Sequence, residues 1–364
     1  MKNDNSAKPG HTPLQTANHP HANHLKVSIG IPAYNEEQNI AKLLNALGKQ
    51  VLGQIHITEI IVIASGCTDG TVKKVEKIMS EWKNLPVLRL IIQTERTGKS
   101  SAVNLFIQEA KEDVLILESA DTIPAPDTVE KLCEPFLDPQ RQVGLTGAHP
   151  VPTNNPSTFI GFCVQTMWQM HHEISLKNPK CGELIAFRRA MPKEHPVPAT
   201  IPGMNSVRGI SAIPSMHPTP IITQIPTQSA VDEASIEAAI VASGLLVTYV
   251  PDAIVYNKGP TTINDFIAQR RRISAGHYWL RRHFGHKPST TSKRTVLWLT
   301  LSRFNMDWKH LRRSLKHNLW LVGMTLLETW SKILGRYDYY IKKRDHMIWA
   351  RIGTSKDPEI TISY

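Results

Sequence analysis

The chain has 364 residues, of which 41% are hydrophobic, and a formal net charge of +11 at pH 7. Its length suffices for one large domain or two small ones, and its apolar content supports a real core. The charge is uneven, because residues 269–351 carry nineteen Lys and Arg against four Asp and Glu. This basic third predicts either an acidic partner (a diphosphate, anionic lipid headgroups or nucleic acid) or a solvated basic face.

The cysteines and the amino-terminal residues bear on the cellular setting. The four cysteines lie far apart without a CxxC pair, which excludes a recognisable zinc site or disulfide framework. A reducing, cytoplasmic setting is therefore expected. Residues 1–25 are polar and lack the apolar core of a signal peptide, so they predict a disordered tail. No run approaches the roughly 18 apolar residues of a membrane helix.

Strands and helices alternate through the first part of the chain. Short apolar runs that predict buried strands stand at residues 27–32, 57–63, 88–92 and 114–117. The segments between them have helical spacing, as Ile40, Leu43, Leu44 and Leu47 show. This order predicts an α/β fold with a Rossmann-like, mostly parallel sheet and helices on both faces. Pro124 and Pro126 are expected to end regular structure after the fourth strand.

The later elements are less regular. In order, we expect a helix at 157–176, a strand at 183–187, strands at 245–250 and 253–256 with a turn at Pro251-Asp252, and a helix from Thr262 through the 269–272 run. Residues 191–229 are Pro-rich without periodicity, and predict either a mobile lid or a disordered insertion.

A basic helical region ends the chain. Its apolar stripe comprises Leu319, Val322, Leu326, Trp330 and Ile333. Such an amphipathic helix, flanked by Lys and Arg, either covers the core or lies on a membrane surface through residues 316–344. The expected organisation is a tail at 1–25, a main domain at 26–285 and a basic helical extension at 286–364.

Polar residues follow each of the first four predicted strands. In chain order they are Tyr34-Asn35-Glu36, Asp69, Gly98-Lys99 and Asp121. Because parallel strands end at one edge of a sheet, these residues should converge there. Together they are suited to hold a base or ribose, and a diphosphate through Lys99 and a cation on Asp121. Taken alone, Asp121 is equally suited to capping a turn. The absence of GxxxxGK[ST] and of GxGxxG after a strand excludes a P-loop and disfavours an NAD site.

Six short motifs occur in order at compatible spacing: IPAYNEEQNI, ASGCTDGT, RTGKSSAVN, SADT, VDEASIE and QRRRI. As a set they resemble the inverting glycosyltransferase family 2, which has the GT-A fold. The resemblance covers residues 27–279 and continues more weakly through LLETWSKILGRYDYY. It implies transfer of a sugar from a nucleoside diphosphate sugar to a hydroxyl of a glycan or lipid-linked acceptor. We expect no nucleic-acid partner.

The resemblance also implies residue roles. Direct displacement needs a metal, Mg²⁺ or Mn²⁺, on the leaving diphosphate and a base on the acceptor hydroxyl. The implied roles are Tyr34 and Glu36 on the base and ribose, Asp69 on the base, Lys99 near the phosphates or ribose, Asp121 on the metal, Asp232 or Glu233 as catalytic base, and Gln269, Arg271 and Arg272 on the diphosphate and acceptor side. We prefer Glu233 as the base, with its pKa raised by Asp232. The alternative is that this pair only caps a helix.

The sequence departs from the family pattern at three positions. Ser65 and Ser119 replace acidic residues of the second and fourth motifs, and Ile273 replaces the Trp of QxxRW. The last change, together with the lack of a predicted membrane helix, favours a non-processive enzyme, in the cytoplasm or at the inner membrane face. The alternatives are a catalytically degenerate protein that binds a nucleotide sugar or a partner, and a sugar-phosphate nucleotidyltransferase. The latter expects a Gly-rich loop where Pro32-Ala33-Tyr34 stands.

Overall fold

The structure is a computed structural model that describes residues 24–83, 86–191, 221–285, 293–304 and 311–344. Nearly all of the predicted tail at 1–25 and most of the predicted insertion at 191–229 lie outside the described residues. So do three parts of the predicted extension, at 286–292, 305–310 and 345–364.

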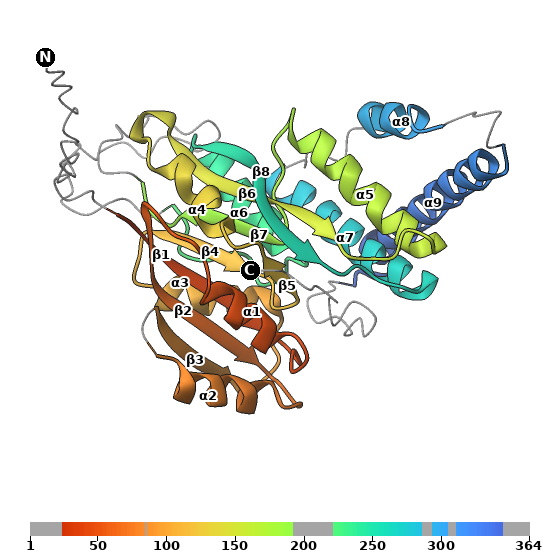
Figure 1. The fold of residues 1–364 in the computed structure, drawn as a ribbon. Helices are drawn as coiled ribbons and strands as arrows, with labels where there is room; N and C mark the ends of the chain where they lie inside the picture. The colour runs from red at the N-terminus through yellow and green to blue at the C-terminus, as the bar shows by residue number, and fades with distance from the viewer. Residues whose placement is uncertain (1–23, 84–85, 192–220, 286–292, 305–310, 345–364) are drawn as a thin grey trace, which may run out of the picture.

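One sheet of eight strands organises the chain, in the order β3-β2-β1-β4-β7-β6-β8-β5 (Figure 1). The strands are β1 (Leu25–Ala33), β2 (Ile55–Ser65), β3 (Val87–Gln93), β4 (Val114–Glu118), β5 (Thr122–Pro124), β6 (Val143–Pro152), β7 (Leu184–Arg188) and β8 (Leu246–Asn257). Pairings along the sheet make all strands but β7 and β5 run in one direction. The predicted mostly parallel α/β sheet is confirmed.

Helices cover both faces of this sheet (Figure 1). They are α1 (Ile40–Leu47), α2 (Thr71–Glu81), α3 (Lys99–Glu109), α4 (Thr128–Cys133), α5 (Phe159–Ser175), α6 (Asp232–Ala242), α7 (Ile263–Phe284), α8 (Lys293–Leu301) and α9 (Leu311–Tyr337). Along β2, Ile60 and Val62 join the core under α1, α2 and α4, whereas Ile61 and Ile63 join the core under α3 and α6. Burial on both sides explains why this strand is a continuous apolar run.

Two local predictions were wrong. Residues 122–124 are not irregular but form β5, which pairs antiparallel with β8. Because β5 is an edge strand, Pro124 is accommodated there without an N–H to donate. The predicted turn at Pro251-Asp252 lies inside the continuous strand β8. The sheet absorbs these residues as a bulge, since the register with β6 shifts between Gly147 and His149.

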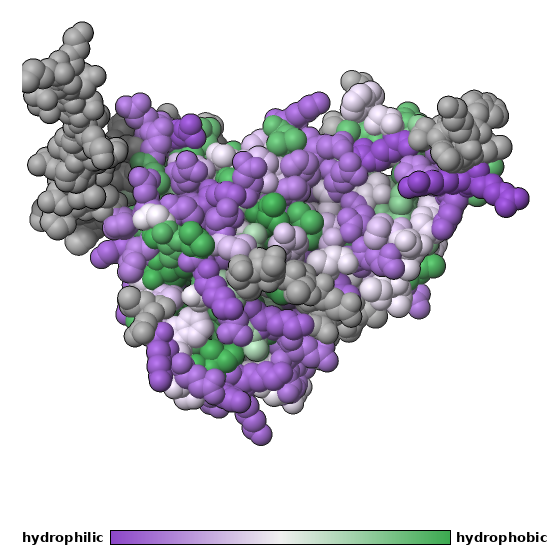
Figure 2. All heavy atoms as spheres, viewed as in Figure 1, coloured by the Kyte–Doolittle hydropathy of each residue, from purple (hydrophilic) through white to green (hydrophobic). Residues whose placement is uncertain are grey.

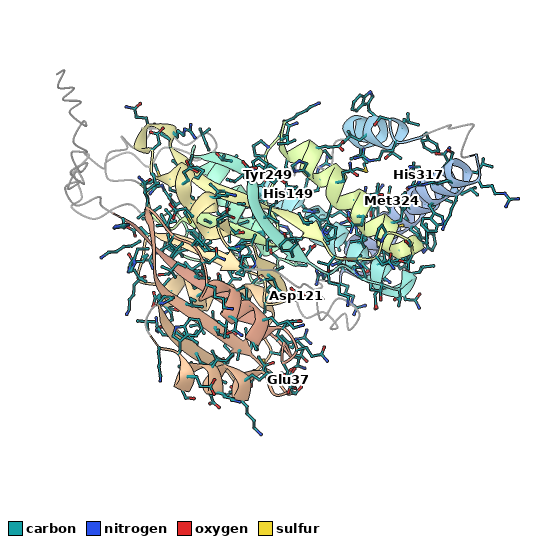
Figure 3. The ribbon with its side chains drawn as sticks, viewed as in Figure 1. Glu37, Asp121, His149, Tyr249, His317 and Met324 are labelled. Atoms are coloured by element: carbon teal, nitrogen blue, oxygen red, sulfur yellow. The ribbon has the colours of Figure 1, made fainter. Side chains whose placement is uncertain are left out.

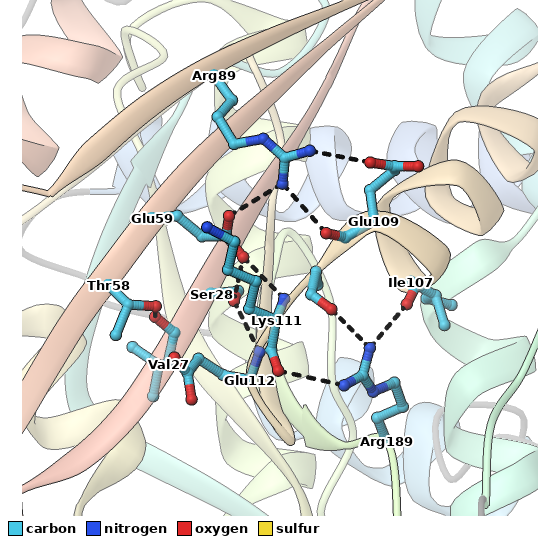
Figure 4. A network of polar contacts seen from close by, with 11 residues as sticks. Val27, Ser28, Thr58, Glu59, Arg89, Ile107, Glu109, Lys111, Glu112 and Arg189 are labelled. Carbon is cyan, nitrogen blue, oxygen red and sulfur yellow. Dashed lines mark hydrogen bonds and ion pairs between the residues drawn. The ribbon is translucent and has the colours of Figure 1, made fainter.

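A buried acid joins the first strands at their amino-terminal end (Figure 4). Glu59 of β2 is 1% exposed and accepts hydrogen bonds from Ser28 Oγ (2.9 Å), Lys111 N (2.8 Å) and Arg89 Nη1 (3.0 Å). Burial acts to raise the pKa of Glu59, but these donors outweigh burial and lower the pKa. Arg89 also pairs with Glu109 at 2.9 Å. The cluster therefore ties β1, β2, β3 and the end of α3 together.

The carboxyl-terminal helices pack beside α5, on the side of the molecule away from β2 and β3 (Figure 1). Leu321 and Met324 of α9 share an apolar cluster with Phe266 of α7. Arg270 of α7 donates two 2.8 Å hydrogen bonds to the carboxylate of Glu328 on α9. Ion pairs across this contact therefore fix which face of α9 turns inward. Among the described helices, none is long and apolar enough to cross a bilayer.

The Arg270–Glu328 pair predicts an acid-dependent loss of stability. Burial acts to raise the pKa of Glu328, but Arg270 and Lys332 outweigh it and lower the pKa from 4.5 to about 2. A lowered carboxyl pKa stabilises the fold above pH 4.5, and this contribution is lost as the pH falls towards 2. Glu328→Gln should therefore lower the free energy of unfolding by on the order of 3 kcal/mol near neutral pH.

The measurement is urea unfolding of wild type and Glu328→Gln near neutral pH and at about pH 3.5, where the gap should shrink. Glu81→Gln, at an exposed position of α2, is the matched control and should behave as wild type at both pH values. A gap that stays constant with pH would contradict the assigned role of the pair.

Candidate active site

A cavity of about 670 Å³ opens at the carboxyl edge of the parallel strands. Asp121 lies there, between the amino-terminal strands and the later helices (Figure 3). The cavity brings together eight of the ten predicted site residues: Tyr34, Glu36, Lys99, Asp121, Asp232, Glu233, Gln269 and Arg272. Asp69 and Arg271 do not line it. Convergence at the strand ends, expected from the sequence, thus describes most of the site.

Residues after β1 form one wall of the cavity. The guanidinium of Arg96 lies 3.7 Å from the centre of the Tyr34 ring, an arrangement that fixes the ring by a cation–π contact. Glu36 is 6% exposed and accepts a 2.8 Å hydrogen bond from Asn39 Nδ2. Asp69 instead accepts from the backbone N–H of Thr71 at 3.0 Å. This contact satisfies a donor at the start of α2, which is a structural role.

Lys99 joins two elements that are far apart in the sequence. It begins α3, directly after Gly98, whose φ of 98° is readily adopted only by glycine. Its Nζ lies 2.9 Å from Asp232 Oδ2 and 2.9 Å from Glu233 Oε1, at the start of α6. Burial acts to lower the pKa of Lys99, but the two carboxylates outweigh burial and raise it. Lys99 is therefore a fixed cation between two acids.

The two acids differ in protonation behaviour, and the expected raised pKa of Glu233 was wrong. Burial acts to raise the pKa of Glu233, but Lys99 and, less strongly, Arg272 outweigh burial and lower it. Burial and the adjacent charge of Glu233 raise the pKa of Asp232. Glu233 is also the more accessible, with 20% of its side chain exposed against 7% for Asp232. The cavity thus presents an ionised Glu233.

Glu183 is a cavity residue that the sequence did not reveal. The backbone carbonyl of Glu183 accepts a 3.2 Å hydrogen bond from the N–H of Ser119. Glu183 therefore lies next to Ser119, the position at which the family pattern has an acid. Burial, followed by the charges of Asp121 and Glu233, raises the pKa of Glu183 to about 7. Its φ of 64° is strained for a non-glycine residue. Because β7 runs antiparallel to β4, the start of β7 reaches the edge where β4 ends.

The acids beside β4 fit a hard divalent cation. Asp121 and Glu183 both line the cavity and offer oxygen ligands only. Glu118 is fully buried nearby; its Oε2 has no hydrogen-bond partner, and burial raises its pKa to about 8. Within the described ranges, no three His, Cys, Asp or Glu side chains form a ready-made metal cage. Two carboxylates nevertheless suit Mg²⁺ or Mn²⁺, which retain water and phosphate oxygens as ligands.

Helix α7 contributes the opposite wall. Gln269, Arg272 and Ile273 line the cavity, so the position of the missing family Trp is part of the site. Burial lowers the pKa of Arg272, an effect opposed by the charges of Asp232, Glu233, Glu183 and Asp121. Arg271 points elsewhere and makes a two-pronged ion pair with Asp338 after α9. Its side chain holds the carboxyl-terminal region rather than the cavity.

The cavity extends from the sheet edge towards the carboxyl-terminal helices. Apolar side chains line this extension: Met167 and Trp168 of α5, Val296 of α8 and Met324 of α9. Two titratable groups, His171 and Lys180, also face it. Burial lowers the pKa of His171 to about 3 and that of Lys180 to about 8. The aromatic and Met residues of α5 have helical spacing, and such periodicity does not distinguish a core face from a cavity wall.

Comparison with known proteins identifies relatives of part of this chain. Residues 28–189 match the sequence profile of glycosyl transferase family 2. Residues 28–189 therefore form a glycosyl transferase family 2 domain. The chain is similar to the dolichol-phosphate mannosyltransferase of Pyrococcus furiosus, 34% identical over 110 residues, which is 30% of this chain and 30% of that protein. The enzyme of the same name from Saccharomyces cerevisiae is 33% identical over 115 residues, 31% of this chain and 42% of that protein. Both matches span less than half of the relative's length.

A solved structure extends the fold comparison beyond the family 2 domain. Mannosyltransferase PcManGT from Pyrobaculum calidifontis superposes with a TM-score of 0.52 at 18% identity. The match covers 86% of this chain and 90% of that chain. At this identity the likeness establishes a shared architecture, and it confirms the expected GT-A-like fold with a carboxyl-terminal helical region.

Removing the cation between the two acids should destabilise the protein in a pH-dependent way. Lys99→Met leaves Asp232 and Glu233 buried side by side, and breaking a buried pair typically costs about 3–5 kcal/mol. Without Lys99 both carboxyl pKa values rise, so the cost of ionising them grows as the pH rises from 5 to 8. The loss should therefore be larger at the higher pH.

Thermal and urea unfolding of Lys99→Met at both ends of that pH range measures this effect. Lys77→Met, at an exposed position of α2, is the matched control and should shift little. The prediction fails if Lys99→Met and Lys77→Met lose equal stability, or if the loss in Lys99→Met does not grow with pH. Either result would show that Asp232 and Glu233 do not need Lys99 to stay buried.

Proposed function

We propose that this protein is an inverting, metal-dependent, non-processive glycosyltransferase, which moves a sugar from a nucleoside diphosphate sugar to a hydroxyl acceptor. The observation that carries the proposal is the arrangement of two acidic pairs in one cavity. Asp121 and Glu183 lie at the end of β4, whereas Asp232 and Glu233 lie at the start of α6. One pair is suited to a cation and the other to a proton, and displacement of a diphosphate needs both.

The donor is expected to lie along the strand ends. Tyr34 and Glu36 would face the base and ribose in this arrangement, and Asp121 with Glu183 would hold Mg²⁺ or Mn²⁺. When bound, the cation neutralises the charge of the leaving diphosphate. Arg272 adds a second positive charge on the opposite wall. A GDP-sugar such as GDP-mannose is the first donor to test, because the relatives are named mannosyltransferases and PcManGT was solved with GDP-Man and Mn²⁺.

The acceptor hydroxyl is expected next to Glu233. Its oxygen attacks the anomeric carbon as the bond to the diphosphate breaks, and its proton passes to the ionised carboxylate of Glu233. Attack from the side opposite the leaving group inverts the anomeric centre. Asp232 acts as a positioning residue, since it holds Lys99 from the buried side. A role for Asp69 at the base remains a prediction, and Arg271 is proposed to act only through its pair with Asp338.

The apolar extension supports an acceptor carried on an apolar group. Met167, Trp168 and Met324 present apolar surfaces to the cavity. These surfaces suit a hydrocarbon better than a polar glycan chain. The named activity of the P. furiosus and S. cerevisiae relatives, dolichol-phosphate mannosyl transfer, points the same way. Ile273 supplies no aromatic platform for a growing sugar chain, which favours transfer of one residue at a time.

Removal of either acid at the metal position should abolish metal-dependent turnover. Asp121→Asn and Glu183→Gln each lose a charged ligand while keeping the side-chain volume, so kcat should fall by about 100-fold or more. The measurement is release of nucleoside diphosphate from a panel of nucleotide sugars with Mn²⁺. Asp127→Asn, on a nearby partly exposed acid, is the control and should keep wild-type turnover.

Calorimetric titration of the donor separates the two candidate functions. The enzyme proposal fails if Asp121→Asn and Glu183→Gln both retain turnover. Donor binding by wild-type protein with no turnover for any sugar in the panel would instead support a degenerate binding protein, which Ser65 and Ser119 favour.

Substitution of the proposed base should separate chemistry from binding. Glu233→Gln should lower kcat by roughly 100- to 10,000-fold, the usual range for a general base, with donor Kd nearly unchanged. Near neutral pH, Glu233→Gln should also lower stability more than Asp232→Asn does, because folding lowers the pKa of Glu233 but raises that of Asp232. If Asp232→Asn loses turnover while Glu233→Gln keeps it, the roles of the two acids are exchanged.

A further inference from the structure

Helix α9 turns its apolar side to solvent. A row of large apolar side chains faces outward along α9 and the short π-helix η5 (Asp338–Lys342) that follows it, each between 45% and 69% exposed: Leu315, Leu319, Val322, Leu326, Trp330, Ile333, Tyr337 and Ile341. Their spacing of three or four residues places them on one helical face. The inward face carries Leu321 and Met324 but also Ser331 and Asp338, all buried. The stripe identified in the sequence therefore does not cover the core.

The charged side chains of residues 311–344 are also divided between the inward and outward sides. The sequence from 311 to 344 contains two acids, Glu328 and Asp338, and both are turned inward against Arg270 and Arg271. Its cations remain exposed: Arg312, Arg313, Lys316, Lys332, Arg336, Lys342, Lys343 and Arg344. Long hydrophilic side chains project from this side of the molecule (Figure 2). The outward face therefore presents an apolar row flanked by positive charge.

Neighbouring residues enlarge the same kind of surface. Trp298, Leu301 and Phe304, in and just after α8, are 62%, 58% and 43% exposed. Lys177 lies 6.0 Å from the centre of the Trp298 ring. Exposed aromatic residues beside Lys and Arg are typical of helices that lie at the boundary between lipid headgroups and acyl chains. Soluble monomers rarely expose an apolar row of this extent.

The charge distribution distinguishes between occupants of this face. A second copy of the chain, related by a twofold axis, would bring two rows of cations together, and like charges oppose such a contact. An anionic lipid surface instead complements the cations and receives the apolar row beneath its headgroups. Residues on the inward side of the same helix, Met324 and Glu328, line the cavity. Binding along α9 would thus place the cavity next to the bilayer surface.

We propose that the outward face of α9 and η5 binds in the plane of an anionic lipid bilayer. The basic side chains contact acidic headgroups, and Leu319, Leu326 and Trp330 insert below them. In this arrangement none of the described helices crosses the bilayer. It assigns the protein to an anionic membrane surface and stands independently of the sugar-transfer reaction.

Flotation of the full-length protein with phosphatidylcholine vesicles, with and without phosphatidylglycerol, tests the proposal. Wild type should float with the anionic vesicles and lose binding at high salt. The double variant Leu326→Glu/Trp330→Glu should bind at least about tenfold more weakly, because two anchors become acids. Val51→Glu/Val87→Glu, at exposed apolar positions far from α9, is the matched control and should bind like wild type. Circular dichroism checks that both variants fold.

Three outcomes would overturn the proposal. They are absence of wild-type flotation at low salt, equal flotation of the α9 double variant, and a concentration-dependent dimer in sedimentation velocity that the α9 substitutions abolish while vesicle binding is absent. Donor hydrolysis without vesicles is measured in parallel. Neither Leu326 nor Trp330 lines the cavity, so the double variant should keep that activity. Wild-type protein that floats with anionic vesicles but hydrolyses no donor would contradict the transferase proposal alone.

Discussion

The site depends on the contact between Lys99 and two adjacent acids. This contact joins the first residue of α3 to the start of α6, 134 residues later in the chain for the pair with Glu233. Other contacts support the same junction: Ser100 donates to the carbonyl of Ser229, and Asn104 exchanges hydrogen bonds with the backbone of Ile225. Because burial penalises isolated charges, one cation between two carboxylates holds the start of α6 against α3 and keeps Glu233 ionised.

Much of the fold and site follows from the sequence because parallel strands impose a simple geometry. Apolar runs locate strands, and the polar residues after them must meet at one edge. That reasoning gave Tyr34, Lys99 and Asp121 their correct places in the cavity. It missed Glu183, because nothing in an apolar pattern reveals that a strand runs backwards. In an antiparallel strand the first residue, not the last, reaches the shared edge.

The orientation of α9 was beyond sequence reasoning for a different reason. An apolar stripe usually marks the buried face of a helix, and the pattern itself left core and membrane readings open. The structure turns the stripe away from the core through Arg270 with Glu328 and Arg271 with Asp338. These partners are 58 and 67 residues apart. A local pattern cannot pair residues at such separations, yet these pairs decide which side of the helix faces the protein.

The cluster around Glu59 lies at the opposite end of the strands from the cavity. Ser28, Arg89 and the backbone at Lys111 hold this buried charge where the parallel strands begin (Figure 4). The residues that secure the sheet are therefore separate from those that select a ligand. Loops at the carboxyl edge are free to change in length and composition without weakening the anchor. The same scaffold can in this way acquire a new donor or acceptor through substitutions that leave its folding intact.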